Sequence, residues 1–168
     1  MYTTKQMVRK LLIGAAAMAA AICITIFIRE NMDVQDPEQA LPVMTVTMNG
    51  SAAIPPDMVF RAGYEWNFLT TTAKDTPPYS TQDLQQHTPP VDMFARTYMD
   101  IDFSIQPKSL VISRASEENY DLFMDLVDVE DGPLIAPATP GVYMYRIQAD
   151  FGWRGSAIYF FRVRVAGT

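Results

Sequence analysis

Carboxylates are the side chains in this sequence that could most readily do chemistry. Asp100 and Asp102 alternate with apolar residues in YMDIDF, so they share one face of an expected strand, and Asp128, Glu130 and Asp131 lie close together in DVEDG. Such groups could bind calcium, which takes several oxygen ligands, or form the carboxylate pair of a glycoside hydrolase. Their spacing does not match an EF-hand loop. We therefore expect a solvated strand face and an acidic turn, with no metal site and no cofactor.

The single histidine, His87, lies in QQHTPP. A nucleophile–base pair or a zinc site would have to use it, because the one cysteine, Cys23, lies inside a long apolar run. The sequence contains no GxSxG, phosphate-binding loop or dinucleotide-binding motif. We expect His87 to be a solvated loop residue and the protein to be non-catalytic.

Two tryptophans could stack on a sugar or contact a partner. Trp66 alternates with Tyr64 and Phe68, which is typical of a core position on a strand. Trp153 stands next to Arg154 between two glycines in DFGWRGS, and aromatic and arginine side chains are enriched at binding hot spots. Trp153 and Arg154 are therefore the candidate partner contacts. The alternative for Trp153 is that it caps one end of the fold.

The clearest element around Trp153 is an expected hairpin, residues 141–165. Period-two alternation assigns one inward face on its two strands, made of Tyr143, Tyr145, Ile147, Ala149, Phe151, Ala157, Tyr159, Phe161, Val163 and Val165. The outward face then carries Met144, Arg146, Gln148, Asp150, Phe160, Arg162 and Arg164. We expect its arginines to pair with acidic residues on a neighbouring element, namely Asp121, Asp125 or Asp128.

Further strands are predicted at residues 43–48, 58–71, 98–106 and 110–116, with a turn at Asn49-Gly50 and a bulge or bend at Gly63. Residues 70–90 are rich in Thr, Gln and Pro and predict a long surface loop. The segment YDLFMDLVDVEDG fits a helix or a strand. Several short strands without a long helix among them favour an all-β fold, an antiparallel β-sandwich.

The apolar run LLIGAAAMAAAICITIFI, residues 11–28, predicts a transmembrane anchor. Basic residues precede it and mostly acidic residues follow, so we expect residues 1–10 to be a cytoplasmic tail, 29–42 a linker and 43–168 an extracytoplasmic domain of a single-pass cell-membrane protein. Cleavage as a signal peptide and lipidation of Cys23 are the alternatives. Ten basic against 19 acidic residues after the run give that part a net charge of −9, which argues against binding nucleic acid.

The stretch PGVYMY resembles the tyrosine corner of immunoglobulin-like sandwiches, in which a tyrosine hydroxyl, here that of Tyr143, bonds back to nearby backbone. Residues 43–165 also resemble a family of small anchored or lipidated surface proteins of Gram-positive bacteria, through Asn49-Gly50, AGYEW, AKDTPPY, IDFSIQPKSL and the closing hairpin. Phe151 stands where that family usually has tryptophan, and a lipobox is missing. The resemblance implies an immunoglobulin-like β-sandwich and a surface location, and the family has no assigned activity.

These observations favour a membrane-tethered interaction or sensory accessory module, held in the lipid bilayer by residues 11–28, with an envelope protein or a wall component as its partner. The alternative is cell-wall carbohydrate binding or hydrolysis through Trp153 and the acidic strand face. A third hypothesis is a subunit that stabilises a membrane complex through the helix rich in Gly and Ala.

Overall fold

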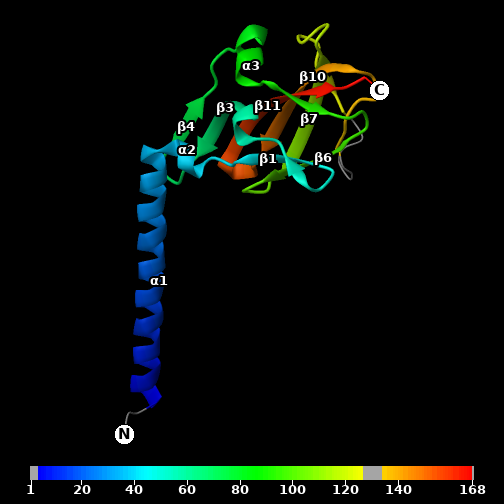
Figure 1. Ribbon diagram of the computed structural model, residues 1–168. Coiled ribbons are helices and arrows are strands. Elements are labelled where there is room, and N and C mark those ends of the chain that lie inside the picture. Colours follow the sequence, from blue (N-terminus) through cyan, green and yellow to red (C-terminus); the bar gives the residue numbers. More distant parts are fainter. Residues whose placement is uncertain (1–3, 127–133, 168) are drawn as a thin grey trace. The chain divides into compact units, whose positions relative to one another are not determined.

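The structure is a computed structural model, and it describes residues 4–126 and 134–167 (Figure 1). The chain divides into two compact units, Met1–Leu41 and Pro42–Thr168.

The first unit is helical. Helix α1, Thr4–Gln35, contains the whole predicted apolar run and has no buried residue, and its length and composition are sufficient to cross a membrane. An N-terminal signal sequence has the same properties, so α1 could be a single membrane span or a signal anchor. The helix continues to Gln35, through residues that we expected in the linker, because Gly and Pro are absent between residue 29 and Pro37. Pro37 then begins the short helix α2, Pro37–Ala40.

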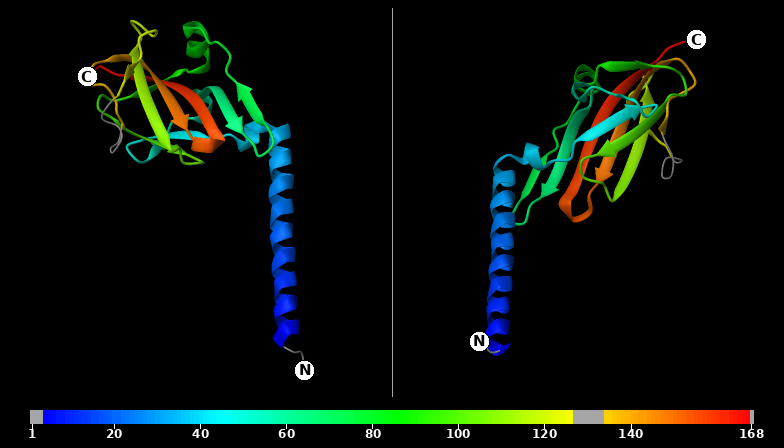
Figure 2. Two further views of the ribbon diagram at one scale, coloured as in Figure 1. Left: turned by 180° about the vertical axis from the view of Figure 1, so that it is seen from behind. Right: turned by 60° about the horizontal axis from the view of Figure 1, so that its bottom comes forward.

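The second unit is built from two sheets, which is consistent with a β-sandwich (Figures 1 and 2). Among the described residues, the smaller sheet has the strand order β2 (Ala52–Ala53), β1 (Met44–Met48), β6 (Tyr98–Phe103) and β9 (Leu134–Ile135). The larger sheet has the order β4 (Thr72–Asp75), β3 (Phe60–Asn67), β11 (Gly155–Val165), β10 (Gly141–Asp150), β7 (Ser109–Ser116) and β8 (Met124–Asp125). Neighbouring strands are antiparallel, except that β5 (Pro90–Met93) lies parallel to the end of β11.

Most of the predicted inward face of the closing hairpin forms the core, but Tyr143 is only half-buried. Tyr145, Ile147, Phe161 and Val163 are fully buried, and Trp66 on β3 is 1% exposed. Phe103 of the smaller sheet packs edge-on against Tyr159 of the larger one, with ring centroids 5.7 Å apart. The aromatic side chains therefore hold the two sheets together, as the alternation in the sequence predicted.

Two predicted irregularities are confirmed. Asn49 and Gly50 have φ angles of 49° and 68° and turn the chain between β1 and β2. In the pairing of β11 with β3, Ile158 pairs with Gly63 and Tyr159 with Arg61. The residue between them, Ala62, is therefore the extra residue of a β-bulge beside Gly63.

The prediction of one long surface loop at residues 70–90 is wrong. This segment contains β4, then helix α3 (Thr81–His87), and ends at the start of β5. Helix α3 begins with a capping box in which the Ser80 hydroxyl accepts from the Asp83 amide and the Asp83 carboxylate accepts from the Ser80 amide. Its Leu84 is buried, so the helix forms because it has both a cap and an apolar contact.

The outer face of the larger sheet is more buried than the alternation of apolar and polar residues predicted. Met144 and Phe160, expected to face water, are 0% and 7% exposed. They belong to a second apolar cluster on this face, with Ala62, Leu84, Ala115 and Tyr120, flanked by Phe60, Tyr79, Phe123 and Ile158. The ambiguous segment after Tyr120 provides only the short strand β8, and its continuation through residues 127–133 lies outside the described residues.

Candidate functional site

The two candidate contact residues lie together at the tip of the β10–β11 hairpin. A single 3₁₀ turn, Gly152–Arg154, joins the two strands. The side chain of Trp153 is 62% exposed, and the guanidinium carbon of Arg154 lies 4.2 Å from the centre of its ring. Trp153 therefore does not cap the end of the fold from inside. It is presented to solvent with an arginine stacked on it, which is a cation–π arrangement.

Hydrogen bonds fix the backbone of this tip. The Asp150 carboxylate accepts from the Gly152 amide at 2.6 Å, and the Phe151 amide donates to the Gly155 carbonyl at 2.8 Å. From β3, the side-chain amide of Asn67 donates to the carbonyl of Trp153 at 2.9 Å. The tip is thus tied to a neighbouring strand as well as to its own hairpin.

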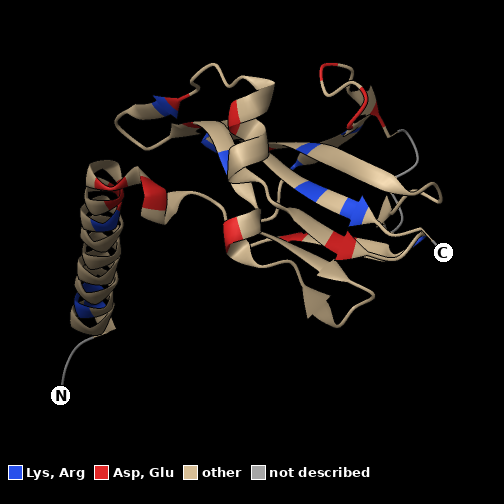
Figure 3. Ribbon diagram, turned by 45° about the horizontal axis from the view of Figure 1, so that its top comes forward, with Lys and Arg blue, Asp and Glu red and all other residues tan. Residues whose placement is uncertain are grey.

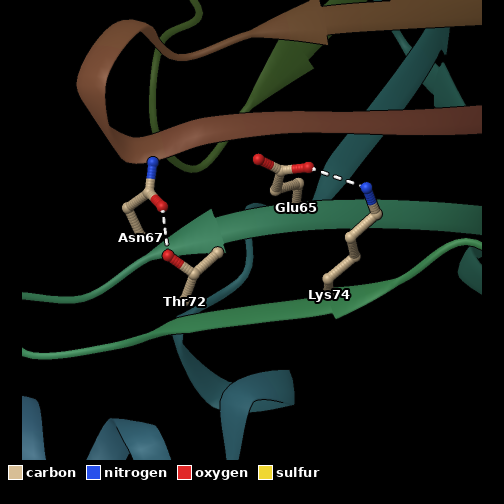
Figure 4. A network of polar contacts seen from close by, with 4 residues as sticks. All are labelled: Glu65, Asn67, Thr72 and Lys74. Carbon is tan, nitrogen blue, oxygen red and sulfur yellow. Dashed lines mark hydrogen bonds and ion pairs between the residues drawn. The ribbon is translucent and has the colours of Figure 1, made fainter.

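Asn67 is itself held in place by β4, as Figure 4 shows. The Thr72 hydroxyl donates to the Asn67 side-chain carbonyl at 2.7 Å. Two residues away on each of the same two strands, Lys74 and Glu65 form an exposed ion pair at 3.0 Å. The Thr72 hydroxyl fixes which end of the Asn67 amide faces the Trp153 carbonyl.

Gly155 allows β11 to leave the tip close to β3. Its φ is +117°, and a Cβ atom placed there would lie 1.9 Å from the carbonyl oxygen of Glu65. A side chain at this position would push the two strands apart where Gly155 pairs with Trp66. The geometry of the tip therefore depends on glycine.

A pocket of about 260 Å³, which we call the outer-face pocket, lies on the outer side of the larger sheet. Its lining comes from β3, β10 and β11, from the segment before α3, and from α3 itself: Ala62, Gly63, Thr76, Pro77, Tyr79, Leu84, Arg146, Gln148, Ile158 and Phe160. The sequence did not indicate this pocket, because residues 76–84 were expected to belong to a long surface loop. The pattern Ser80-Thr81-Gln82-Asp83 is the signal that could have placed a helix there.

Arg146 is the outward arginine that pairs as predicted. Its Nη2 donates to the Ser113 hydroxyl at 3.2 Å and lies 4.0 Å from the Asp125 carboxylate, while the Ser113 hydroxyl donates to the same carboxylate at 2.6 Å. The guanidinium carbon is 4.6 Å from the centre of the Phe123 ring. Its Nε is buried and has no hydrogen-bond partner among the described residues.

The other two outward arginines have different partners from those expected. Figure 3 shows where basic and acidic residues lie along the ribbon. Arg162 donates to the carbonyls of Thr88 and Gln85, so it holds the carboxyl-terminal end of α3 against the sheet. Arg164 pairs with Asp92 at 3.0 Å in an exposed ion pair. Of the predicted acidic partners, Asp121 accepts from a threonine hydroxyl in α3, and Asp128 lies outside the described residues.

Of the remaining candidate residues, His87, Asp100 and Asp102 lie in the described part of the chain. His87 is exposed at the end of α3, where its ring stacks on Phe60 with centroids 4.5 Å apart. Asp100 and Asp102 are exposed on β6 opposite threonines of β1. Within residues 4–126 and 134–167, His, Cys, Asp and Glu side chains nowhere gather in a group of three that could hold a metal ion. Asp128, Glu130 and Asp131 lie in the undescribed segment.

Two tyrosine hydroxyls tie strands to backbone outside those strands. Tyr143 donates to the carbonyl of Thr139 at 3.0 Å, which is the contact predicted from PGVYMY, although it is exposed. Tyr159 donates to the carbonyl of Pro42 at 2.6 Å in a buried contact. Burial raises the pKa of Tyr159 to about 12, despite the opposing effect of the nearby Arg61 cation. Tyr159 therefore fastens the beginning of the second unit to the central strand.

Comparison with protein-family models, with curated proteins and with solved structures found no match to this chain.

Proposed function

We propose that this protein is a membrane-tethered, extracytoplasmic interaction or sensory accessory module without catalytic activity, and that Trp153 and Arg154 contact its partner, an envelope protein or a wall component. One observation carries the proposal. A tryptophan that is 62% exposed sits on a backbone held by both neighbouring strands. Large exposed aromatics next to arginine are typical of binding hot spots.

The rigidity of the tip favours binding. A contact residue that is mobile before binding loses conformational entropy when it is fixed, typically about 0.5–1.5 kcal/mol per side chain. The Trp153 ring already carries the Arg154 guanidinium, and its carbonyl is held by Asn67. Less freedom remains to be lost, so more of the contact free energy would appear as affinity.

The membrane tether is supported by α1. None of its apolar residues is buried in the protein, so a different environment must cover them if they are to avoid water. The basic residues that precede the run favour a cytoplasmic N-terminus and an external second unit. Protease added to intact cells should then remove the second unit and leave an N-terminal tag protected. A protected second unit would contradict this orientation, and a soluble form that starts near Ala21 would show a cleaved signal.

Carbohydrate binding is the second candidate, because an exposed tryptophan ring also suits stacking on a sugar. The same variant tests both candidates, and the choice of capture assay separates them. Trp153→Ala should abolish capture of the partner and leave the free energy of unfolding nearly unchanged, well below the loss of about 3–5 kcal/mol for a core aromatic. The capture assays would be a pull-down from solubilised membranes and, separately, binding to purified wall polysaccharide.

Phe94 provides the matched control, because it is another aromatic on a turn and is 80% exposed. Phe94→Ala removes a similar exposed ring and should leave capture unchanged. Loss of capture in Trp153→Ala alone supports the proposal, and the assay that shows the loss identifies the class of partner. Equal capture by both variants and the unaltered protein would refute a role for Trp153.

A further inference from the structure

The outer-face pocket exists because two small residues leave its floor empty. Gln148, Ile158 and Gly63 form one row across β10, β11 and β3, and Arg146 and Phe160 are paired in the next row. Ala62, the bulge residue, also lines the floor. At Gly63 a Cβ atom would lie 3.1 Å from the carbonyl oxygen of Asp75, so the chain before α3 passes directly over this part of the sheet.

The lining of the pocket is divided into an apolar and a polar side. Leu84 and Tyr79 belong to the chain that passes over the sheet, and Ile158 and Phe160 belong to β11. The polar side is β10, from which Arg146 and Gln148 project on the same face, two residues apart. A molecule that enters the pocket therefore meets carbon on one side and hydrogen-bond donors on the other.

Arg146 gives the pocket its charge, since it is the only charged residue among the described residues that line it. Both of its polar contacts with described residues go through Nη2, and the Asp125 carboxylate at 4.0 Å is at the outer limit of an ion pair. Nε is buried without an acceptor. The guanidinium thus keeps its positive charge and one donor, Nε, without an acceptor in a partly dry site, where a carboxylate is its natural partner.

We propose that the outer-face pocket binds a small monocarboxylate that carries an apolar ring or short chain. The carboxylate would lie at Arg146 and Gln148, and the apolar part would cover Ile158 and Phe160 beneath Leu84. The volume supports a ligand of this size, because a cavity of about 150 Å³ accepts benzene and this pocket offers about 260 Å³. The site is separate from the tip that carries Trp153, and the proposal does not depend on the proposed function.

A fluorinated probe tests the proposal directly. The full chain in phosphatidylcholine nanodiscs would be titrated with 4-(4-fluorophenyl)butyrate, and binding would be followed by the fluorine NMR line width, with empty nanodiscs as the blank. We expect saturable binding with a dissociation constant of about 1 mM, as befits a ligand of this size. Excess unlabelled 4-phenylbutyrate should reverse the broadening.

The role of charge is tested by removing it from the ligand and, separately, from Arg146. The neutral amide of the same probe should bind the unaltered protein about tenfold more weakly than the carboxylate does. This comparison requires no variant. Arg146→Gln should weaken the carboxylate about tenfold and leave the amide nearly unchanged. Arg164→Gln removes the same charge from the same outward face, outside the pocket lining, and should change neither probe.

A third variant tests the location. Ala62→Leu would fill the floor and should weaken the carboxylate and the amide alike, with thermal unfolding measured for every variant to show that it is folded. Equal binding of carboxylate and amide to the unaltered protein would overturn the proposal. It would also be overturned by an absence of saturable binding, or by folded Arg146→Gln and Ala62→Leu variants that bind as the unaltered protein does.

Discussion

Gly155→Ala is the substitution for which the structure sets the largest loss of stability. Gly155 has φ +117° and ψ −151°, a backbone region that is nearly restricted to glycine and costs other residues about 1–3 kcal/mol. A methyl group would also lie 1.9 Å from the Glu65 carbonyl oxygen, which is backbone and can move only if β3 moves. Overpacking of this kind costs about 1–3 kcal/mol more. We therefore expect Gly155→Ala to lower the free energy of unfolding by about 2–6 kcal/mol.

Gly50→Ala separates the two contributions. Gly50 also has a positive φ, +68°, but a Cβ atom there would meet nothing within 4 Å. Only the backbone cost applies, about 1–2 kcal/mol, so the two variants should differ by the overpacking cost, roughly 1–3 kcal/mol. Urea unfolding of the full chain in detergent micelles, followed by the near-ultraviolet dichroism of the buried Trp66, measures both. If the two variants lost the same stability, the close contact between Gly155 and Glu65 would be refuted.

Three further substitutions test individual contacts by the same unfolding assay. Tyr143→Phe should cost about 0.5–1 kcal/mol, because it removes an exposed hydroxyl bond, whereas Tyr98→Phe should cost nothing; equal losses would contradict the corner contact. The pKa of Tyr159 is about 12 against an ordinary value of 10.0, so the folded state keeps its proton longer and stability should fall by about 2–3 kcal/mol as the pH rises from 10 to 12. Tyr159→Phe should remove that part of the alkaline loss, and an unchanged alkaline profile would be the contrary result. The Ser80 hydroxyl and amide lower the pKa of Asp83 below its ordinary value of 3.8, so Asp83 contributes stability above that range which is lost as the pH falls through its folded pKa. Asp83→Asn should therefore show a shallower loss of stability in acid, and a slope equal to that of the unaltered protein would argue against the capping box.

The strands of the core were predictable because their signal is local. Tyr145 and Ile147 alternate with their neighbours along one strand, and that alternation is sufficient to assign a buried face. Gly63 likewise marked the bulge from its position in an otherwise regular strand. The two-sheet arrangement follows from many such short strands, since each must bury one face against another element.

The covering of the outer face was not predictable in the same way. Met144 and Phe160 occupy outward positions by alternation, and what buries them is a helix and a loop from other parts of the chain. The Arg162 contact with the end of α3 joins residues more than 70 positions apart, and nothing local indicates it. The two apolar side chains in outward positions nevertheless indicated that another part of the chain packs on this face.

The candidate sites differ for the same reason. The tip of the hairpin could be found from the sequence, because Trp153 and Arg154 are adjacent and flanked by glycines. The structure added the exposure of the ring and its support by Asn67. The outer-face pocket combines three separate segments, and Arg146 was predicted only to pair with an acidic residue. That pairing is present through Asp125, and it leaves the guanidinium partly unused.

The position of β11 in the larger sheet constrains how the protein can be made. It is the last strand in the sequence, yet β10, β3 and β5 all pair with it. On the ribosome β3 must therefore wait without this partner while about 90 further residues are synthesised, and β5 while about 60 are, at rates of about 5–20 residues per second. Unpaired strand edges invite pairing with other chains during that interval. A nascent chain that stops before residue 155 would lack the strand that joins β3 to β10, so this sheet is completed only after synthesis has passed it.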